Sequence, residues 1–84
     1  MPPHTTIVLP SFNEEEALPV VVADIRSVLG TDADILVVDD GSSDGTATVA
    51  RDLGCAVEVH TTNRGKGAAI RTGVAAASGE IVIV

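Results

Sequence analysis

The hydrophobic pattern of this 84-residue chain alternates between two periods. Short apolar runs that are typical of β-strands occupy residues 6–9, 34–38, 55–61 and 80–84, and the stretches between them carry apolar residues at helical spacing. Such alternation indicates β-α-β units, in which consecutive strands run parallel in one sheet. We therefore predict one α/β domain over residues 1–84, with the order β-α-β-α-β-α-β and a mostly parallel sheet.

Proline, asparagine and glycine set the expected boundaries of the first strand and the first helix. Pro10 has no backbone N–H, so the strand should stop before it. Asn13 is the candidate N-cap of the helix that follows, and Gly30 is the candidate residue for its C-terminal end. We expect the apolar stripe of this helix to cover one face of the sheet.

The last predicted helix, residues 68–78, is rich in small side chains. Ala69, Gly73 and Ala76 would allow this helix to approach the sheet closely, and Gly79 should end it. The fourth apolar run begins directly afterwards, and the chain stops inside it. Because a finished domain rarely ends on an apolar strand, we expect a longer protein to continue at this point, so that the domain is cut in or after its fourth strand.

Charge and composition exclude several classes of partner. The net charge of −7 would repel a nucleic acid, and with Phe12 as the single aromatic residue the chain has no aromatic and basic surface for DNA or RNA. Cys55 is the only cysteine and is expected to be a small buried residue. No apolar run approaches the roughly 18 residues that cross a membrane, and no secretory signal opens the chain, so we expect a cytoplasmic protein.

Polar side chains follow the first three predicted strands. In an open parallel sheet, ligands bind at the carboxyl ends of the strands, so these side chains should meet at one edge. They are Ser11, Asn13, Glu14, Asp39, Asp40, Asn63, Arg64 and Lys66. Three loops are therefore expected to form one site.

The two adjacent aspartates at the end of the second apolar run are assigned different roles. An ionised carboxylate only accepts hydrogen bonds, which suits a ribose diol or the imino N–H of a base, and Asp39 stands where such a ligand would lie. Asp40 and Asp44 precede glycine-containing turns, where aspartate commonly closes a turn or caps a helix. We therefore expect Asp39 to contact a ligand and the other two to hold the loop.

The stretch "NRGKGAAIRTG" gathers most of the basic residues of an acidic chain around a helix N-terminus. Backbone N–H groups and positive charge together favour an anion, so Arg64 and Lys66 are candidates for contact with phosphates. The stretch matches neither the Walker loop nor the G-x-G-x-x-G fingerprint, because Ile70 stands where the third glycine belongs. His4 and His60 have no metal-ligand spacing and are expected to be neither ligands nor bases.

Four stretches occur in an order and spacing that resemble the N-terminal half of a family 2 inverting glycosyltransferase with the Rossmann-like GT-A fold. They are "IVLPSFNEEEALP", "ILVVDDGSSDGT", "NRGKGAAIRTG" and "ASGEIVIV". Within that family, the chain is most similar to polyprenyl-phosphate sugar transferases such as the dolichyl-phosphate mannose synthases. The resemblance covers nearly the whole chain after its first few residues.

This family holds the donor nucleotide with the loop after the first strand and with the first aspartate of the "DDGS" motif. By this resemblance, the nucleotide-sugar-binding residues are Pro10, Phe12, Glu14, Val37, Asp39, Arg64 and Lys66. Val37 would line the pocket, Asp39 would accept a hydrogen bond from base or ribose, and the loop with Arg64 would lie near the nucleotide more loosely. Phe12 stands where tyrosine is commoner, which keeps an aromatic ring for stacking and removes a hydroxyl group.

The resemblance also implies parts that this chain does not contain. The D-x-D motif that binds Mg²⁺ or Mn²⁺ follows the fourth strand in the family, as do the acceptor site and any catalytic base. The chain is therefore expected to bind a UDP- or GDP-sugar but not to transfer the sugar alone. The resemblance suggests a polyprenyl phosphate as the acceptor. Because such an acceptor lies in a membrane, the resemblance is also consistent with a protein at the cytoplasmic face of that membrane.

Two other classes of protein remain open from the residues alone. Adjacent acids at a strand end also form the Mg²⁺ site of receiver-like regulatory modules, although there they follow the first strand and here they follow the second. A dinucleotide-binding half is the other alternative, and the glycine count disfavours it.

Overall fold

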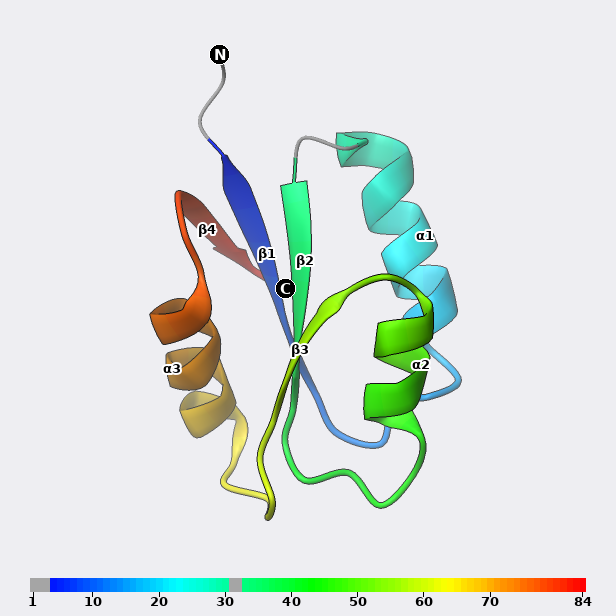
Figure 1. Ribbon diagram of the computed structural model, residues 1–84, viewed down its shortest axis with the longest axis vertical. Coiled ribbons are helices and arrows are strands. Elements are labelled where there is room, and N and C mark those ends of the chain that lie inside the picture. The colour runs from blue at the N-terminus through cyan, green and yellow to red at the C-terminus, as the bar shows by residue number, and fades with distance from the viewer. Residues whose placement is uncertain (1–3, 31–32) are drawn as a thin grey trace.

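The computed structural model describes residues 4–30 and 33–84, and within them the elements alternate as the sequence predicts (Figure 1). The strands and helices, in chain order, are β1 (Thr5–Ser11), α1 (Leu18–Leu29), β2 (Ala33–Asp39), α2 (Thr46–Asp52), β3 (Ala56–Val59), α3 (Lys66–Ala76) and β4 (Glu80–Ile83). The predicted α/β class and element order are confirmed.

The strands form one four-stranded sheet in the order β3-β2-β1-β4, and every neighbouring pair is parallel. The chain first builds the sheet outward from β1 through β2 to β3 and then crosses to the other side of β1 to form β4. In open α/β sheets, a ligand-binding crevice forms at the carboxyl ends of the strands where the direction of building reverses. In this fold that point lies beside the end of β1.

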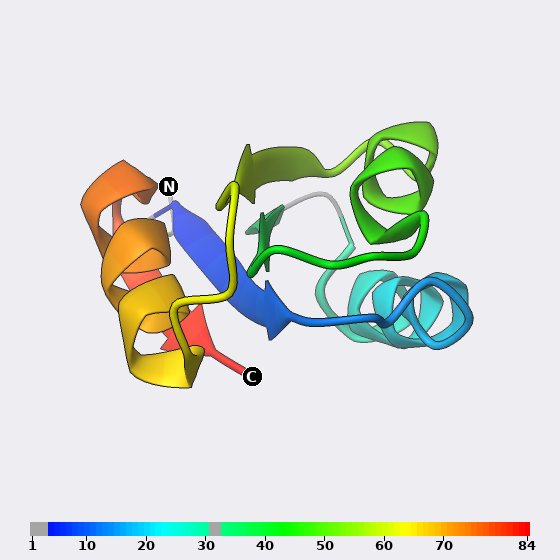
Figure 2. The same cartoon turned by 90° about the horizontal axis from the view of Figure 1, so that it is seen from below.

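Helices cover both faces of the sheet, which explains why the central strands are continuous apolar runs. In Figures 1 and 2, α1 and α2 lie together on one side of the strands and α3 lies alone on the other. Alternate residues of β1 and β2 point to opposite faces, so that Ile7 packs in the cluster under α1 and α2 while Val8 packs under α3. Both clusters are small, as the many Ala and Val residues predict.

Two boundaries differ from the sequence prediction at the N-terminal end of the fold. β1 continues through Pro10 to Ser11, and the pairing with β4 ends at Val8, so no β4 residue is paired with Pro10. The N-cap of α1 is Ala17, without a side-chain hydrogen bond, whereas Asn13 adopts a left-handed backbone conformation with φ of 54°. Gly30 does end α1, with φ of 61°.

The end of α3 also differs from the prediction. The helix stops at Ala76, three residues before Gly79, which adopts a positive φ in the turn into β4. Ala69 and Gly73 are buried against the sheet as expected, but Ala76 is exposed, and Ala77 packs against the core instead. The expected burial of Ala76 is therefore wrong.

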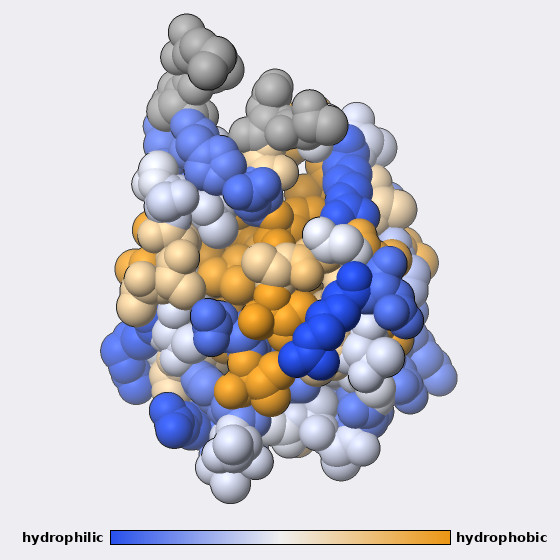
Figure 3. Space-filling view, in the orientation of Figure 1, coloured by the Kyte–Doolittle hydropathy of each residue, from blue (hydrophilic) through white to orange (hydrophobic). Residues whose placement is uncertain are grey.

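One face of the molecule has an apolar middle with polar side chains around it. Figure 3 shows apolar side chains gathered along the middle of one face, with hydrophilic side chains around them and at the end where the loops after the strands lie. Within residues 4–30 and 33–84, none of the helices has the length and hydropathy needed to cross a bilayer.

Candidate functional site

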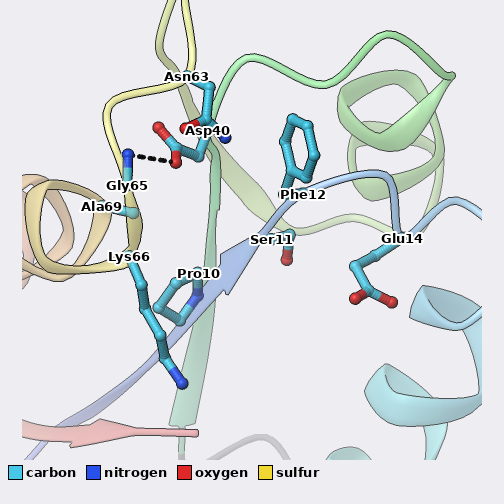
Figure 4. A pocket seen from close by; sticks show the side chains of 9 residues that line it. All are labelled: Pro10, Ser11, Phe12, Glu14, Asp40, Asn63, Gly65, Lys66 and Ala69. Carbon is cyan, nitrogen blue, oxygen red and sulfur yellow. Dashed lines mark hydrogen bonds between the residues drawn. The ribbon is translucent and has the colours of Figure 1, made fainter.

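A cavity of about 310 Å³ lies at the carboxyl end of β1, beside the start of α3. Residues from all three loops that follow β1, β2 and β3 contribute to its wall (Figure 4). They are Pro10, Ser11, Phe12, Glu14, Asp40, Asn63, Gly65, Lys66 and Ala69. The predicted meeting of three loops at one edge of the sheet is therefore observed.

The wall of the cavity carries an aromatic ring, a carboxylate and a lysine side chain. Figure 4 shows the Phe12 ring and the Glu14 carboxylate on one side and the Lys66 side chain on the other, with the end of β1 between them. Phe12, the only aromatic residue of the chain, is 48% exposed and does not pack into the core. The arrangement can stack a planar ring on Phe12 and place an anion near Lys66 and the start of α3.

Asn13 connects the loop after β1 to the loop after β2. Its backbone N–H donates to the Ser42 hydroxyl at 2.8 Å, and its side-chain oxygen accepts from the backbone N–H of Ser43 at 2.9 Å. The left-handed backbone conformation of Asn13 accompanies these contacts, and asparagine adopts that conformation more readily than most residues. Asn13 therefore acts as a bridge between loops rather than as the predicted helix cap.

Thr46 and Asp44 form a second bridge between the same two loops. The Thr46 hydroxyl accepts from the Glu14 N–H at 2.9 Å and donates to the Asp44 carboxylate. The hydrogen bond from this hydroxyl lowers the pKa of Asp44 below its ordinary value. The Glu15 carboxylate accepts from the Gly45 N–H at 2.8 Å, so the polar contacts run in both directions. Gly45 is the N-cap of α2, and the Asp44 carboxylate accepts from the Thr46 N–H at 2.9 Å at the start of this helix.

Asp40 binds the loop after β3. One oxygen of its carboxylate accepts from the Arg64 N–H at 2.8 Å, and the other accepts from the Gly65 N–H at 2.9 Å. His60 Nδ1 lies 2.8 Å from the first of these oxygens. The Arg64 N–H and, next, the His60 ring hold the pKa of Asp40 below its ordinary value, against the opposing effect of burial.

His60 is buried between Asp40 and α3. Its Nε2 lies 2.7 Å from the Thr72 hydroxyl, so both ring nitrogens have partners. The backbone of Gly41 packs closely against the backbone of Asn63, because a Cβ atom at Gly41 would lie 2.5 Å from the Asn63 nitrogen. The loops after β2 and β3 are therefore packed backbone against backbone.

The structure brings Pro10, Phe12, Glu14 and Lys66 together on the cavity wall. Asp39, Val37 and Arg64 are not among the lining residues. Asp39 is buried and its Oδ1 accepts from the Ser42 N–H at 3.0 Å, Val37 lies in the core cluster under α1 and α2, and the Arg64 side chain is exposed. Their roles toward a nucleotide stay predictions.

The sequence predicted that Asp40 holds a loop, but it did not indicate that Asp40 binds the loop after β3 or that His60 and Thr72 take part. The pairing register of β2 and β3 is a signal that could have indicated the contact between Asp40 and His60. β2 and β3 pair Asp39 with Val59, so the next residues along each strand, Asp40 and His60, come to lie opposite each other. Thr72 comes from α3, and no local pattern in the sequence indicates that it reaches the same point.

Neither metal-ion nor cysteine chemistry has a site in the part of the chain that the structure describes. No three His, Cys, Asp or Glu side chains there form a group that could hold a metal ion. The Asp40 carboxylate already accepts from three donors. Cys55 is buried in the core, as predicted, and burial raises the pKa of its thiol, which disfavours the nucleophilic thiolate.

Curated relatives of this chain are named as glycosyltransferases. An uncharacterised glycosyltransferase of Mycobacterium tuberculosis is 49% identical over 79 residues, covering 94% of this chain and 34% of that protein. A dolichyl-phosphate beta-glucosyltransferase of Homo sapiens is 38% identical over 94 residues, covering 94% of this chain and 29% of that protein.

Solved structures share the fold. Glucosyl-3-phosphoglycerate synthase from Mycobacterium tuberculosis, in complex with Mn²⁺, UDP and glucosyl-3-phosphoglycerate, superposes with a TM-score of 0.84 and 28% identity, covering 99% of this chain and 33% of that one. The chain thus spans about a third of the length of the proteins that it matches.

The family profile described as "Glycosyl transferase family 2" matches residues 6–84, which is nearly the whole chain. The match includes every strand end and loop that forms the cavity. The chain, with its four-stranded parallel sheet, therefore belongs to glycosyl transferase family 2.

Proposed function

We propose that this chain forms the part of a glycosyltransferase that binds the nucleotide of a UDP- or GDP-sugar, for transfer of the sugar to an acceptor with inversion. The observation that carries the proposal is the cavity of about 310 Å³ at the end of β1, whose wall has the exposed Phe12 ring on one side of the strand end and Lys66 on the other. A nucleotide offers a planar base at one end and a diphosphate at the other, which matches these two sides.

The predicted contacts divide between base, ribose and phosphates. Phe12 stacks on the base, and Asp39 accepts a hydrogen bond from base or ribose after a small movement of the loop that holds Ser42. Lys66, at the start of α3, and Arg64 lie on the diphosphate side, where positive charge and the helix N-terminus favour an anion. Pro10 and Glu14 complete the pocket around base and ribose in this proposal, and Val37 supports it from the core.

The remaining parts of the reaction belong to residues outside this chain. A Mg²⁺ or Mn²⁺ ion would offset the negative charge that develops on the departing nucleoside diphosphate. The described residues include no group of ligands for this ion. The Mn²⁺ in the related synthase supports the expectation of a metal in the complete enzyme. We infer that the chain binds the donor but does not transfer sugar by itself.

The acceptor and the location are inferred from the relatives. The human relative is named for dolichyl phosphate, whereas the related synthase was solved with a phosphoglycerate product. A polyprenyl phosphate is the acceptor that we propose, and with it a position at the cytoplasmic face of a membrane. Transfer of label from UDP-glucose or GDP-mannose to a short-chain polyprenyl phosphate, rather than to 3-phosphoglycerate, would support this assignment in the complete enzyme.

The proposal is tested by titrating the isotope-labelled chain with UDP and with GDP and recording two-dimensional NMR spectra. We expect shifts in residues 10–14, 37–40 and 64–66 with one of the two nucleotides, and their loss in the Asp39→Asn variant. Asp24→Asn, an exposed aspartate on α1, serves as the matched control. A well-dispersed spectrum that neither nucleotide changes would contradict the proposed binding site.

A further inference from the structure

His60 occupies a buried position between two segments that flank the cavity, but it does not line the cavity itself. Its ring joins Asp40, which follows β2, to Thr72 on α3, at 2.8 and 2.7 Å. Asp40 in turn lines the cavity and binds the backbone of Arg64 and Gly65. His60 directly precedes the loop with the basic residues, and its ring is also linked to the backbone of that loop through the Asp40 carboxylate.

The chemistry of Asp40 fixes the direction of the first hydrogen bond. The Arg64 N–H and the His60 ring keep the Asp40 carboxylate in its ionised form, which can only accept hydrogen bonds. His60 Nδ1 must therefore carry a hydrogen and donate it to Asp40. A charge-assisted bond of this kind is stronger and more directional than one between neutral groups.

The backbone of the same loop is held from a second side. Gly41 lies so close to Asn63 that a side chain would not fit between them, while Gly65 donates to Asp40 just before α3 begins. Asp40 and its neighbour Gly41 thus contact the backbone of three consecutive residues, Asn63, Arg64 and Gly65. No described buried side-chain nitrogen or oxygen lacks a hydrogen-bond partner, so the network is fully satisfied.

We propose that His60 is a positioning residue of the nucleotide site. Its ring, held by Thr72 of α3, orients the Asp40 carboxylate. This carboxylate in turn sets the placement of the loop that carries Arg64 and Lys66. The inference rests on the proposed function, since the loop is the diphosphate side of that site. A loop held in its binding conformation before the ligand arrives avoids the entropy cost of ordering it on binding.

The test compares variants of His60 that differ in which partner they can still reach. His60→Asn places an amide near the position of Nδ1 and retains a donor for Asp40, whereas His60→Gln extends toward Thr72, and His60→Leu removes both contacts. His4→Leu is the control, because His4 pairs with Asp34 at an exposed site at 2.9 Å. The readouts are the amide signals of Arg64 and Gly65 without ligand, and the dissociation constant of UDP or GDP.

We expect the Arg64 and Gly65 signals to move and the nucleotide to bind about tenfold more weakly in His60→Leu, as the loss of one charge-assisted hydrogen bond predicts. His60→Asn should return both readouts to near the values of the unmodified chain, and His60→Gln should not. If His60→Leu does not fold, the comparison of the Asn and Gln variants decides, because both keep a polar group in the cavity of the ring.

Two results would overturn the inference. One is an unmodified chain in which ¹⁵N spectra show His60 Nδ1 without a hydrogen, and the other is a folded His60→Leu variant whose Arg64 and Gly65 signals stay in place. Failure of the proposed function looks different. In that case neither UDP nor GDP binds the unmodified chain, while the ligand-free amide signals still report whether His60 places the loop.

Discussion

Asp40 collects three hydrogen-bond donors from segments that lie 20 to 25 residues further along the chain. A carboxylate has about four lone-pair positions, so these donors nearly saturate it. The residue therefore acts as a junction between the loops after β2 and β3, and it is unsuited to bind a metal ion at the same time. Its effect on the site is to hold the 64–65 backbone where α3 begins.

The lowered pKa of Asp40 makes the stability of the fold depend on pH. An ionised Asp40 stabilises the native state above the ordinary pKa of 3.8, and this contribution is lost as the pH falls through the lowered native value. Between the two values the unfolded chain binds more protons, so stability rises with pH. We expect Asp40→Asn to flatten the increase of the urea midpoint below about pH 5.

The control for this pH series is Asp24→Asn, which should leave the slope unchanged because Asp24 is exposed on α1. Part of the slope should remain in Asp40→Asn, since the pKa of Asp44 is also lowered. A variant at position 40 with the full slope of the unmodified chain would show that the Asp40 carboxylate has no net role in stability.

Alanine substitutions at Gly41 and Gly54 distinguish the cost of backbone strain from the cost of a steric clash. Both have positive φ, 74° and 80°, but a Cβ atom at Gly41 would lie 2.5 Å from the Asn63 nitrogen, whereas at Gly54 the nearest atom is a side-chain nitrogen at 3.6 Å. We expect Gly54→Ala to lower the free energy of unfolding by about 1 kcal/mol and Gly41→Ala by about 3 kcal/mol. Equal losses in urea titrations would contradict the close packing of the two loops.

At the scale of elements, α3 is held by close approach rather than by large side chains. Its buried residues are Ala69 and Gly73, and a Cβ atom at Gly73 would collide with the Val8 side chain of β1. Because α3 carries Lys66 at its first position, the depth at which the helix packs also sets how far this lysine stands from Phe12 across the cavity.

Two glycines of α3 should therefore respond in opposite ways to alanine. Gly67 has only the flexible end of Arg71 near it, so Gly67→Ala should raise the free energy of unfolding by about 0.5 kcal/mol through helix propensity. Gly73→Ala gains the same propensity but pushes the helix off β1, and we expect a net loss of about 2 kcal/mol. Thermal or urea unfolding measures both, and a stabilised Gly73→Ala would refute the close packing.

At the scale of the whole molecule, the sheet is covered on both faces, and its edge strands are β3 and β4. Ile81, Val82, Ile83 and Val84 are all exposed, and an apolar groove beside them runs to Val28 of α1. An edge strand with apolar side chains offers unpaired backbone groups to other chains. The β4 edge therefore presents four exposed apolar side chains next to this groove.

This edge predicts concentration-dependent association of the 84-residue chain. Sedimentation velocity over a range of concentrations should show species larger than the 8.5 kDa monomer. Val82→Lys, which places a charge in the groove, should shift the distribution toward the monomer. The matched control is Val20→Lys, at an exposed valine of α1, which should leave the distribution unchanged. A chain that stays monomeric at all concentrations would show that the β4 edge is protected.

Elements with a strong local signal were predicted well, and contacts between distant loops were not. The apolar run 34–38 correctly predicted a central strand, and Ala69 and Gly73 correctly predicted a helix packed closely on the sheet, because period and side-chain size are local properties. Asn13 was assigned to a helix cap because its local sequence suits one. Its contacts with Ser42 and Ser43, 29 and 30 residues away, settled its conformation instead.

The sequence by itself determined the α/β class, the order of elements and the three loops that meet at one edge, since each follows from hydrophobic period and strand direction. Only the tertiary structure decided that Asp40 rather than Asp39 faces the cavity, and that His60 and Thr72 support it. The physical reason is that adjacent residues at a strand end point to opposite sides, and which side faces the cavity depends on the sheet order and on how α3 packs.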